Sequence, residues 1–341
     1  MTFKNTFGHV FQIHSFGESH GVGLGVVIEG CPAGLEIDEK WLHAYMARRR
    51  PGQNAFVTSR NEADEFEILS GILQKKTLGT PIAILFRNHN QRSEDYQNLK
   101  PRQGHADQTW TEKFSHVDLR GGGRSSGRET ISRVAGGAIA RNLLDILNPQ
   151  LKIQVWVQQV GDIVNTLNYS DFEARFDKYE GLKEELSFPD AHQVSVLKER
   201  LAQAKEMGES YGGKIQIRIS GLEAGLGQPV FSKLKSDMAA ALFSIGAVNS
   251  VSLGDEDVFQ KGTLYHAQKS AYGGVQGGIS SGEDITMNVL FKPTSSILDV
   301  AKQGRHDPCI LPRAVVVVES MLALVLADHH LLKRMDNIEV R

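Results

Sequence analysis

Residues 121–133 read GGGRSSGRETISR, a glycine-rich segment that carries serines and arginines. A helix is predicted from Glu129 to Leu147, because apolar residues recur there at 3.6-residue spacing, namely Ile131, Val134, Ala135, Ala138, Ile139 and Leu143. A helix N-terminus presents free N–H groups and the positive end of the helix dipole. The segment therefore predicts an anion site joined to a core helix. It lacks the Gly-Lys-Ser/Thr of a Walker A loop and the Gly-x-Gly-x-x-Gly of a dinucleotide-binding loop.

Strands and helices alternate on both sides of this junction. A short helix is predicted after Asp38, a suitable N-cap, and ends in the cations of residues 48–50. The longest apolar-rich stretch, residues 314–327, contains Glu319 and is shorter than the ~20 residues that span a bilayer. We therefore expect a core element there and no membrane partner. Apolar runs predict strands at residues 81–86, 151–157, 214–219 and 285–291.

The composition is that of an ordinary soluble enzyme. The 341 residues suffice for one large core or two modest ones, with 40% hydrophobic and 23% charged residues. A formal net charge of -2 gives no overall attraction to nucleic acid, so we expect none as a partner. Two cysteines and the lack of a secretory signal predict a cytoplasmic protein. Residues 171–208 are rich in charge, which predicts solvated surface helices without chemistry.

Five further segments place ionisable or hydroxyl side chains beside residues that shape tight turns. Each also has a plain structural interpretation as a polar turn, a solvated helix end, a surface histidine or a capped loop. Cys309 is better read as a small buried hydrophobe than as a nucleophile. The segments are 17–21 (GESHG), 48–52 (RRRPG), 102–107 (RQGHAD), 292–296 (KPTSS) and 305–309 (RHDPC).

Two of the glycine-rich stretches are nearly the same. Residues 122–127 read GGRSSG and residues 277–282 read GGISSG, so they differ at one position. An internal duplication and a coincidence among common small residues both remain open as explanations.

Together and in this order, the segments resemble the signatures of the chorismate synthase family over nearly the whole chain. The motifs are GESHG, RRRPG, RSEDY at residues 92–96, GHAD, GGGRSSGRET, GGISSG, KPTSS and RHDPC. The resemblance implies an α+β fold of the β-α-β sandwich type, with residues 1–341 as a single domain, and a cytoplasmic homotetramer. It implies a lyase at the last common step of the shikimate pathway to aromatic amino acids. The reaction is the 1,4-elimination of phosphate from 5-enolpyruvylshikimate 3-phosphate, which gives chorismate. Reduced FMN is the implied cofactor although there is no net redox change, NADPH is a candidate source of reductant, and no metal is implied.

The resemblance also implies roles for single residues. His20 would protonate the departing phosphate and His105 the reduced flavin, while Ser19 and Asp307 would form a relay that deprotonates flavin N5. The substrate would be clamped by Arg49, Arg102 and Arg133. FMN would be held by Arg124, Ser125, Ser126, Gly246, Ala247, Gly277, Lys292, Pro293, Thr294, Ser295, Ser296 and Arg305, the last of which would also lie near the substrate.

The chain departs from the family pattern at two positions. Many relatives have Arg where this chain has Ala55, which leaves one phosphate or pyridine-nucleotide contact open. Many have Asn-Ala where this chain has Gly246 and Ala247, so a side-chain contact to FMN becomes a backbone contact. The alternative is a phosphate- or nucleotide-binding protein without lyase activity. The set of His20, His105 and Asp307 argues against this alternative. A purely structural protein would leave the clustered arginines unexplained.

Overall fold

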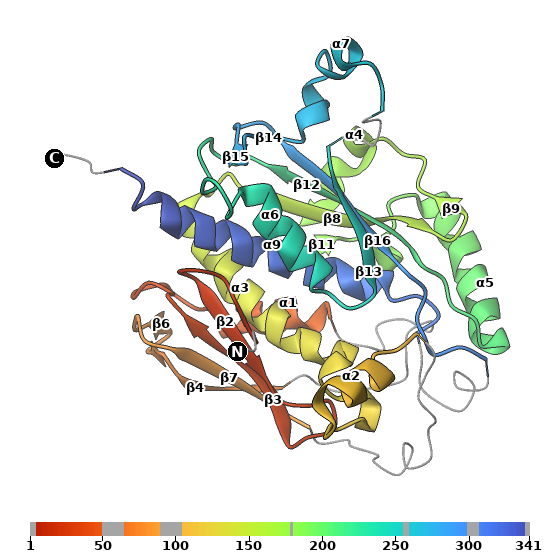
Figure 1. The fold of residues 1–341 in the computed structure, drawn as a ribbon, viewed down its shortest axis with the longest axis horizontal. Helices are drawn as coiled ribbons and strands as arrows, with labels where there is room; N and C mark the ends of the chain where they lie inside the picture. Colours follow the sequence, from red (N-terminus) through yellow and green to blue (C-terminus); the bar gives the residue numbers. More distant parts are fainter. Residues whose placement is uncertain are drawn as a thin grey trace.

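Two antiparallel five-stranded sheets enclose a layer of helices in the computed structural model, which describes residues 5–49, 65–88, 104–177, 180–254, 259–298 and 307–337 (Figure 1). The first sheet has the order β1 (Thr6–Phe7), β2 (Gln12–Phe16), β3 (Gly23–Glu29), β7 (Ile82–Arg87) and β4 (Phe66–Ser70). The second has the order β13 (Val248–Leu253), β16 (Ile285–Phe291), β12 (Gly213–Ser220), β8 (Lys152–Val160) and β9 (Ile163–Val164). The expected β-α-β sandwich is confirmed.

The helical layer joins the two sheets. Helix α3 (Thr130–Leu147) packs on β2 and β3, α9 (Leu311–Lys333) packs on β8 and β12, and the two helices pack on each other. Their close approach depends on Gly137, because a Cβ there would lie 2.3 Å from the Cβ of Ser320. Helix α1 (Glu39–Ala47) packs against α3, and α6 (Leu234–Phe243) packs against α9.

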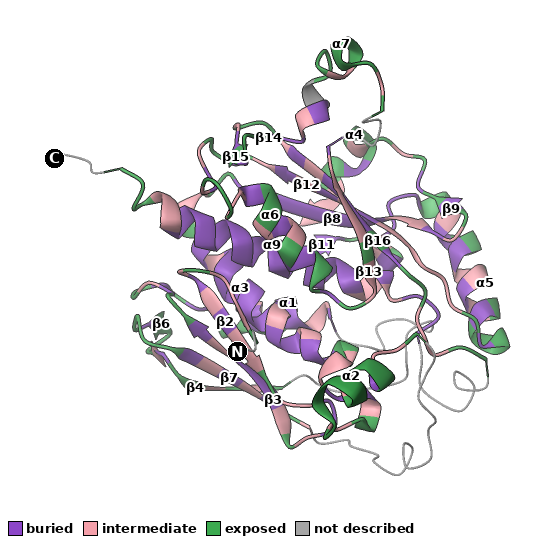
Figure 2. Cartoon of the chain, viewed as in Figure 1, coloured by how far each residue is buried: buried purple, intermediate pink, exposed green. Residues whose placement is uncertain are grey.

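Helix α9 is buried on nearly all sides, as expected for the apolar stretch at residues 314–327 (Figure 2). It is long and apolar enough to cross a membrane, but 94% of its apolar 18-residue stretch is buried inside the protein. A helix that is hydrophobic all round belongs in a core, and here α3, α6 and strands β8 and β12 of the second sheet supply the surroundings.

Smaller elements lie at the edges of the sandwich. Helix α5 (Ala191–Met207) buries Val194, Leu197 and Leu201 along one face and exposes the other, so the charge-rich region is amphipathic and only partly a solvated surface. The others are α2 (Asp107–Phe114), α4 (Tyr169–Phe172), α7 (Gly262–Tyr265), and the paired strands β5 (Ile72–Leu73) with β6 (Lys76–Thr77), β10 (Phe176–Asp177) with β11 (Gly181–Leu182), and β14 (Val275–Gln276) with β15 (Ile279–Ser280).

The predicted elements are confirmed where the structure describes them. All four predicted strands form, as β7, β8, β12 and β16, and the helix predicted from Glu129 forms as α3. Asp38 caps α1, because its side chain accepts a hydrogen bond from the backbone N–H of Lys40 at 2.9 Å. The two similar stretches differ in structure: residues 122–127 form 3₁₀ turns, whereas residues 277–282 include the turn between β14 and β15. Their likeness is therefore no sign of a repeated structural unit.

Candidate active site

The glycine-rich segment turns sharply before it enters α3. Gly121, Gly122 and Gly123 have φ values of 58°, 87° and 51°, a left-handed conformation that favours glycine. A Cβ at Gly121 would lie 2.0 Å from the ring carbon Cε1 of His20. The segment therefore packs directly on the GESHG loop, and two of the motifs that lie about 100 residues apart in the sequence meet at the start of the core helix.

A cavity of about 960 Å³ opens beside this junction. Its wall includes the end of α1, the GHAD loop, the start of α3, the KPTSS loop and the first turns of α9. This volume lies at the upper end of the range typical of ligand pockets. Of the predicted site residues, those that line it are Arg49, His105, Arg124, Ser125, Ser126, Arg133, Gly246, Ala247, Lys292, Pro293, Thr294, Ser295 and Ser296.

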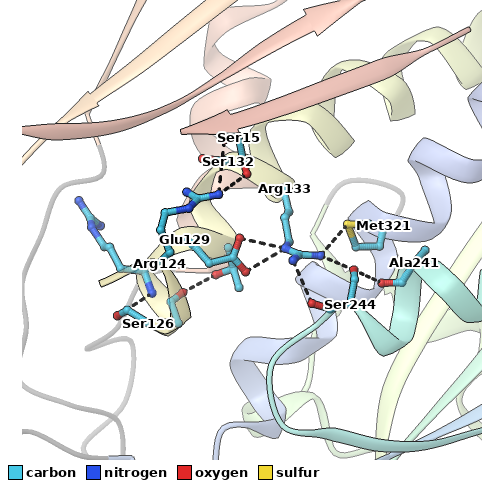
Figure 3. A network of polar contacts seen from close by, with 12 residues as sticks. Ser15, Arg124, Ser126, Glu129, Ser132, Arg133, Ala241, Ser244 and Met321 are labelled. Atoms are coloured by element: carbon cyan, nitrogen blue, oxygen red, sulfur yellow. Dashed lines mark hydrogen bonds and ion pairs between the residues drawn. The ribbon is translucent and has the colours of Figure 1, made fainter. Parts of the chain in front are cut away.

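Arg124 ties the glycine-rich segment to the N-terminal sheet. Its guanidinium donates to the hydroxyl of Ser15 at 2.6 Å (Figure 3). It also donates to the carbonyl of Gly17 at 3.0 Å. Next to it, the Ser125 hydroxyl donates to the carbonyl of Gly122 at 2.7 Å. Ser126 accepts a hydrogen bond from the backbone N–H of Arg128 at 3.3 Å, so it caps the turn that leads into α3.

Arg133 is held by Glu129 at the N-cap of its own helix, by Ser244 at the C-cap of α6 and by Met321 of α9. Its Nε donates to both carboxylate oxygens of Glu129 at 2.9 and 3.1 Å (Figure 3). Its two terminal nitrogens donate to the Ser244 hydroxyl at 2.6 Å and the Ser244 carbonyl at 2.9 Å. The side chain is thus fixed in the wall, and most of its donors are already used.

His105 faces the cavity with its ring oriented by a carboxylate. Its Nδ1 lies 2.5 Å from Oδ1 of Asp107, the first residue of α2. This contact favours the tautomer with a proton on Nδ1, so Nε2 is the nitrogen whose protonation changes in a proton transfer. The loop is also held from the other side: the Gly104 carbonyl accepts from Lys292 Nζ at 3.1 Å and from the Ser295 hydroxyl at 2.8 Å. The GHAD and KPTSS motifs therefore meet.

The first two arginines of the RRRPG motif have different surroundings. Arg49 lines the cavity, whereas Arg48 makes a two-point ion pair with Glu319 of α9, with Nη2 to Oε2 at 2.5 Å and Nη1 to Oε1 at 3.3 Å. Burial disfavours the charged form of Arg48, but Glu319 outweighs it and raises the pKa of the guanidinium. Tyr45 donates to the same carboxylate at 3.2 Å, and burial together with Glu319 raises its pKa. Arg48 is thus an anchor for the end of α1.

Four predicted residues do not line the cavity. His20 and Ser19 are buried behind the glycine-rich segment, and Gly277 lies in the turn between β14 and β15. Asp307 lies behind the wall, where it forms an ion pair with Arg313, and its carbonyl accepts from the Thr294 hydroxyl at 3.4 Å. Outside the described residues lie Arg102, Arg305, Ala55 and the RSEDY run.

A family model described as chorismate synthase matches residues 11–331. The chain belongs to the chorismate synthase family. It is 49% identical to a chorismate synthase of Bdellovibrio bacteriovorus, with 97% of this chain and 98% of that protein covered. A chorismate synthase of Cytophaga hutchinsonii is 41% identical, with 96% and 98% covered. A crystal structure of chorismate synthase matches the fold with a TM-score of 0.77 at 29% identity, covering 97% of this chain and 94% of that one.

Both cysteines of this family member are unsuited to nucleophilic chemistry. Burial raises the pKa of the Cys31 thiol to about 12, and burial also raises that of Cys309 to about 12. Because the thiolate is the reactive form, both side chains behave as small hydrophobes, as predicted for Cys309.

Sequence reasoning missed several residues of the cavity wall. Arg313 is the main one: it lies in the first turn of α9, six residues after Asp307, and its place could have been suspected from a cation that begins an apolar helix. Glu129 is predicted only as the start of a helix, and it lines the cavity as well. Others that line the cavity are Trp110, Asp237, Ser244 and Asp328.

Proposed function

We propose that this chain catalyses the chorismate synthase reaction, the 1,4-elimination of phosphate from 5-enolpyruvylshikimate 3-phosphate. The observation that carries the proposal is a single cavity whose wall combines five cationic side chains with His105, in a chain that belongs to the chorismate synthase family. The substrate is a phosphate ester with two carboxylates, so a cavity lined by cations suits it. The cations are Arg49, Arg124, Arg133, Lys292 and Arg313.

The same cavity fits FMN. Its volume of about 960 Å³ leaves room for a cofactor and a small substrate together. An apolar wall made by Ile245, Phe291, Val317 and Met321 suits a flat aromatic ring system, and the KPTSS loop offers an ammonium and hydroxyls to polar groups and phosphate. Reduced FMN would supply an electron-rich ring system to the reaction. The residues that would hold it are Arg124, Ser125, Ser126, Gly246, Ala247 and Lys292 to Ser296.

The chain's own residues would then hold the reactants and move protons. Arg49 and Arg313 would bind anionic groups of the substrate, with Arg133 contributing positive charge from the wall. His105, oriented by Asp107, would exchange a proton at Nε2 inside the cavity. His20 would protonate the departing phosphate from behind the glycine-rich segment, and Ser19 with Asp307 would remove a proton.

We also propose a cytoplasmic homotetramer, as the family resemblance implies, with NADPH as a candidate source of reductant. Light scattering coupled to size-exclusion chromatography would give the assembly directly, and a mass close to that of one 37.6 kDa chain would exclude the tetramer.

The proposed reaction is tested by its two products. The purified chain, with chemically reduced FMN and substrate under anaerobic conditions, should release chorismate and inorganic phosphate in equal amounts. Phosphate without chorismate would indicate a phosphatase, and neither product would contradict the proposal.

A further inference from the structure

Asn88, the residue that follows β7, joins the first sheet to the GESHG loop. Its side-chain Nδ2 donates to the carbonyl of Gly21 at 2.9 Å and, at longer distances, to the carbonyls of Ser19 at 3.3 Å and Glu18 at 3.4 Å. Its backbone N–H donates to the carbonyl of Val22 at 3.1 Å, which continues the pairing of β7 with β3. One residue therefore contacts four backbone carbonyls of this loop and its end.

The loop that this amide holds is a tight turn with His20 near its tip. The backbone N–H of Gly21 donates to the carbonyl of Glu18 at 3.0 Å, which closes a four-residue turn. Ser19 and His20 are the central residues of this turn. The turn is also bonded to the glycine-rich segment, since the N–H of Ser19 donates to the Gly123 carbonyl at 3.4 Å. His20 is 2% exposed, so the backbone of the turn fixes where its imidazole lies.

The amide of Asn88 suits this place because it is both a donor and an acceptor. Its Nδ2 faces the carbonyls of the turn, and its Oδ1 accepts a hydrogen bond from Nη2 of Arg128 at 3.4 Å. Arg128 is 7% exposed and lies in the turn that leads from the glycine-rich segment into α3. The amide therefore ties the turn that carries His20 to the segment that packs on the imidazole. A carboxylate of the same shape would keep the contact to Arg128 but present oxygen to the carbonyls.

We propose that Asn88 is a positioning residue for His20, whose amide holds the Glu18–Gly21 turn so that the imidazole stays against the glycine-rich segment. The inference rests on the proposed function, in which His20 protonates the departing phosphate. The packing leaves little tolerance, because a Cβ at Gly121 would lie 2.0 Å from Cε1 and 2.2 Å from Nδ1 of the ring. A misplacement of ~1 Å in an active site can lower the rate by ~10²-fold. Loss of the amide should therefore act on turnover, through His20, and much less on ligand binding.

The test is a double-mutant cycle on turnover with reduced FMN. Asn88→Asp should lower turnover by about 10- to 100-fold and change the FMN affinity and substrate KM by less than about threefold, because Asn88 does not line the cavity. His20→Ala should lower turnover by ~10²–10⁴-fold. Because the amide acts through the imidazole, adding Asn88→Asp to His20→Ala should lower turnover further by no more than about twofold.

An NMR measurement follows the same effect without turnover. In protein labelled with carbon-13 at histidine Cε1, the signal that disappears in His20→Ala belongs to His20. This signal should shift in Asn88→Asp, because Cε1 packs on the glycine-rich segment and reports where the ring lies. The signals of other histidines, such as the buried His329, should stay in place. A His20 signal that does not shift would overturn the proposal.

The control is Asn148→Asp, the same substitution at an amide that donates to the Gly221 carbonyl at 2.9 Å at the C-cap of α3, and it should leave turnover unchanged. If Asn88→Asp lowers turnover in the His20→Ala background as much as in the wild-type protein, the amide acts elsewhere and the proposal fails. Asn88→Ala removes the amide without adding a charge, so it serves if Asn88→Asp does not fold. If wild-type protein makes no chorismate, the proposed function fails; if it does and the two substitutions are additive, only the positioning role fails.

Discussion

Replacing Glu319 by Ala should destabilise the protein strongly, because the side chain compensates a charge in the core. Glu319 is 3% exposed and accepts hydrogen bonds from Arg48 at 2.5 and 3.3 Å and from the Tyr45 hydroxyl at 3.2 Å. Without it the guanidinium of Arg48, whose side chain is 13% exposed, loses its buried counter-charge and Tyr45 loses its acceptor. Breaking one side of a buried pair costs about 3–5 kcal/mol, so we expect a loss of that size in the free energy of unfolding.

The assay is equilibrium urea unfolding, followed by circular dichroism at one fixed protein concentration, because association would shift the apparent stability. Glu67→Ala is the matched control: it removes a carboxylate from an ion pair with Arg87 in which both side chains are about half exposed, and such pairs contribute little. Glu319→Gln should be intermediate, since the amide oxygen still accepts from Tyr45. If Glu319→Ala unfolds at the same urea concentration as Glu67→Ala, the buried pair does not anchor α1 and the reasoning is wrong.

Three further predictions address the flavin site, the thiols and the effect of acid. Arg124→Ala should weaken FMN binding far more than Lys40→Ala, an exposed control, in a flavin fluorescence titration, and equal affinities would remove the glycine-rich segment from the flavin site. Cys31 and Cys309, with pKa values of about 12, should react with a disulfide reagent at pH 8 about 10³-fold more slowly than thiols with a pKa of 9.0, until urea unfolds the chain. Burial lowers the pKa of His330, so below about pH 6.5 the unfolded chain binds a proton that the folded chain resists. The free energy of unfolding should therefore decrease as the pH is lowered, by up to about 1.4 kcal/mol per pH unit. The decrease should be steeper in the wild-type protein than in His330→Gln.

The sequence predicted the elements better than the contacts between them. Helix α3 and strand β16 were predicted with nearly correct limits because the spacing of apolar residues depends on the local backbone alone. The way Arg133 is held could not be predicted, since Ser244 lies 111 residues away and meets it only in the folded sandwich. Arg313 was missed for a related reason: its position in the wall depends on where α9 crosses the sandwich.

The motifs predicted which loops gather, and most of the described site residues line the cavity that these loops form. Lys292 and Ser295 are predicted to bind flavin, and the structure shows both donating to the Gly104 carbonyl. Asp307 was expected at the reacting centre and lies behind Arg313. A motif records that a residue type is needed at a place in the chain, but the order of side chains across a cavity wall depends on packing from several elements.

The most direct test of the proposed function compares two oxidation states of one cofactor. Purified protein is mixed anaerobically with substrate and either oxidised or dithionite-reduced FMN, and chorismate is followed together with the amount of flavin that stays reduced. The reaction has no net redox change, so reduced FMN should support many turnovers per flavin without being consumed, and oxidised FMN should support none. Equal rates with both forms, or one flavin oxidised for each chorismate made, would contradict the proposal.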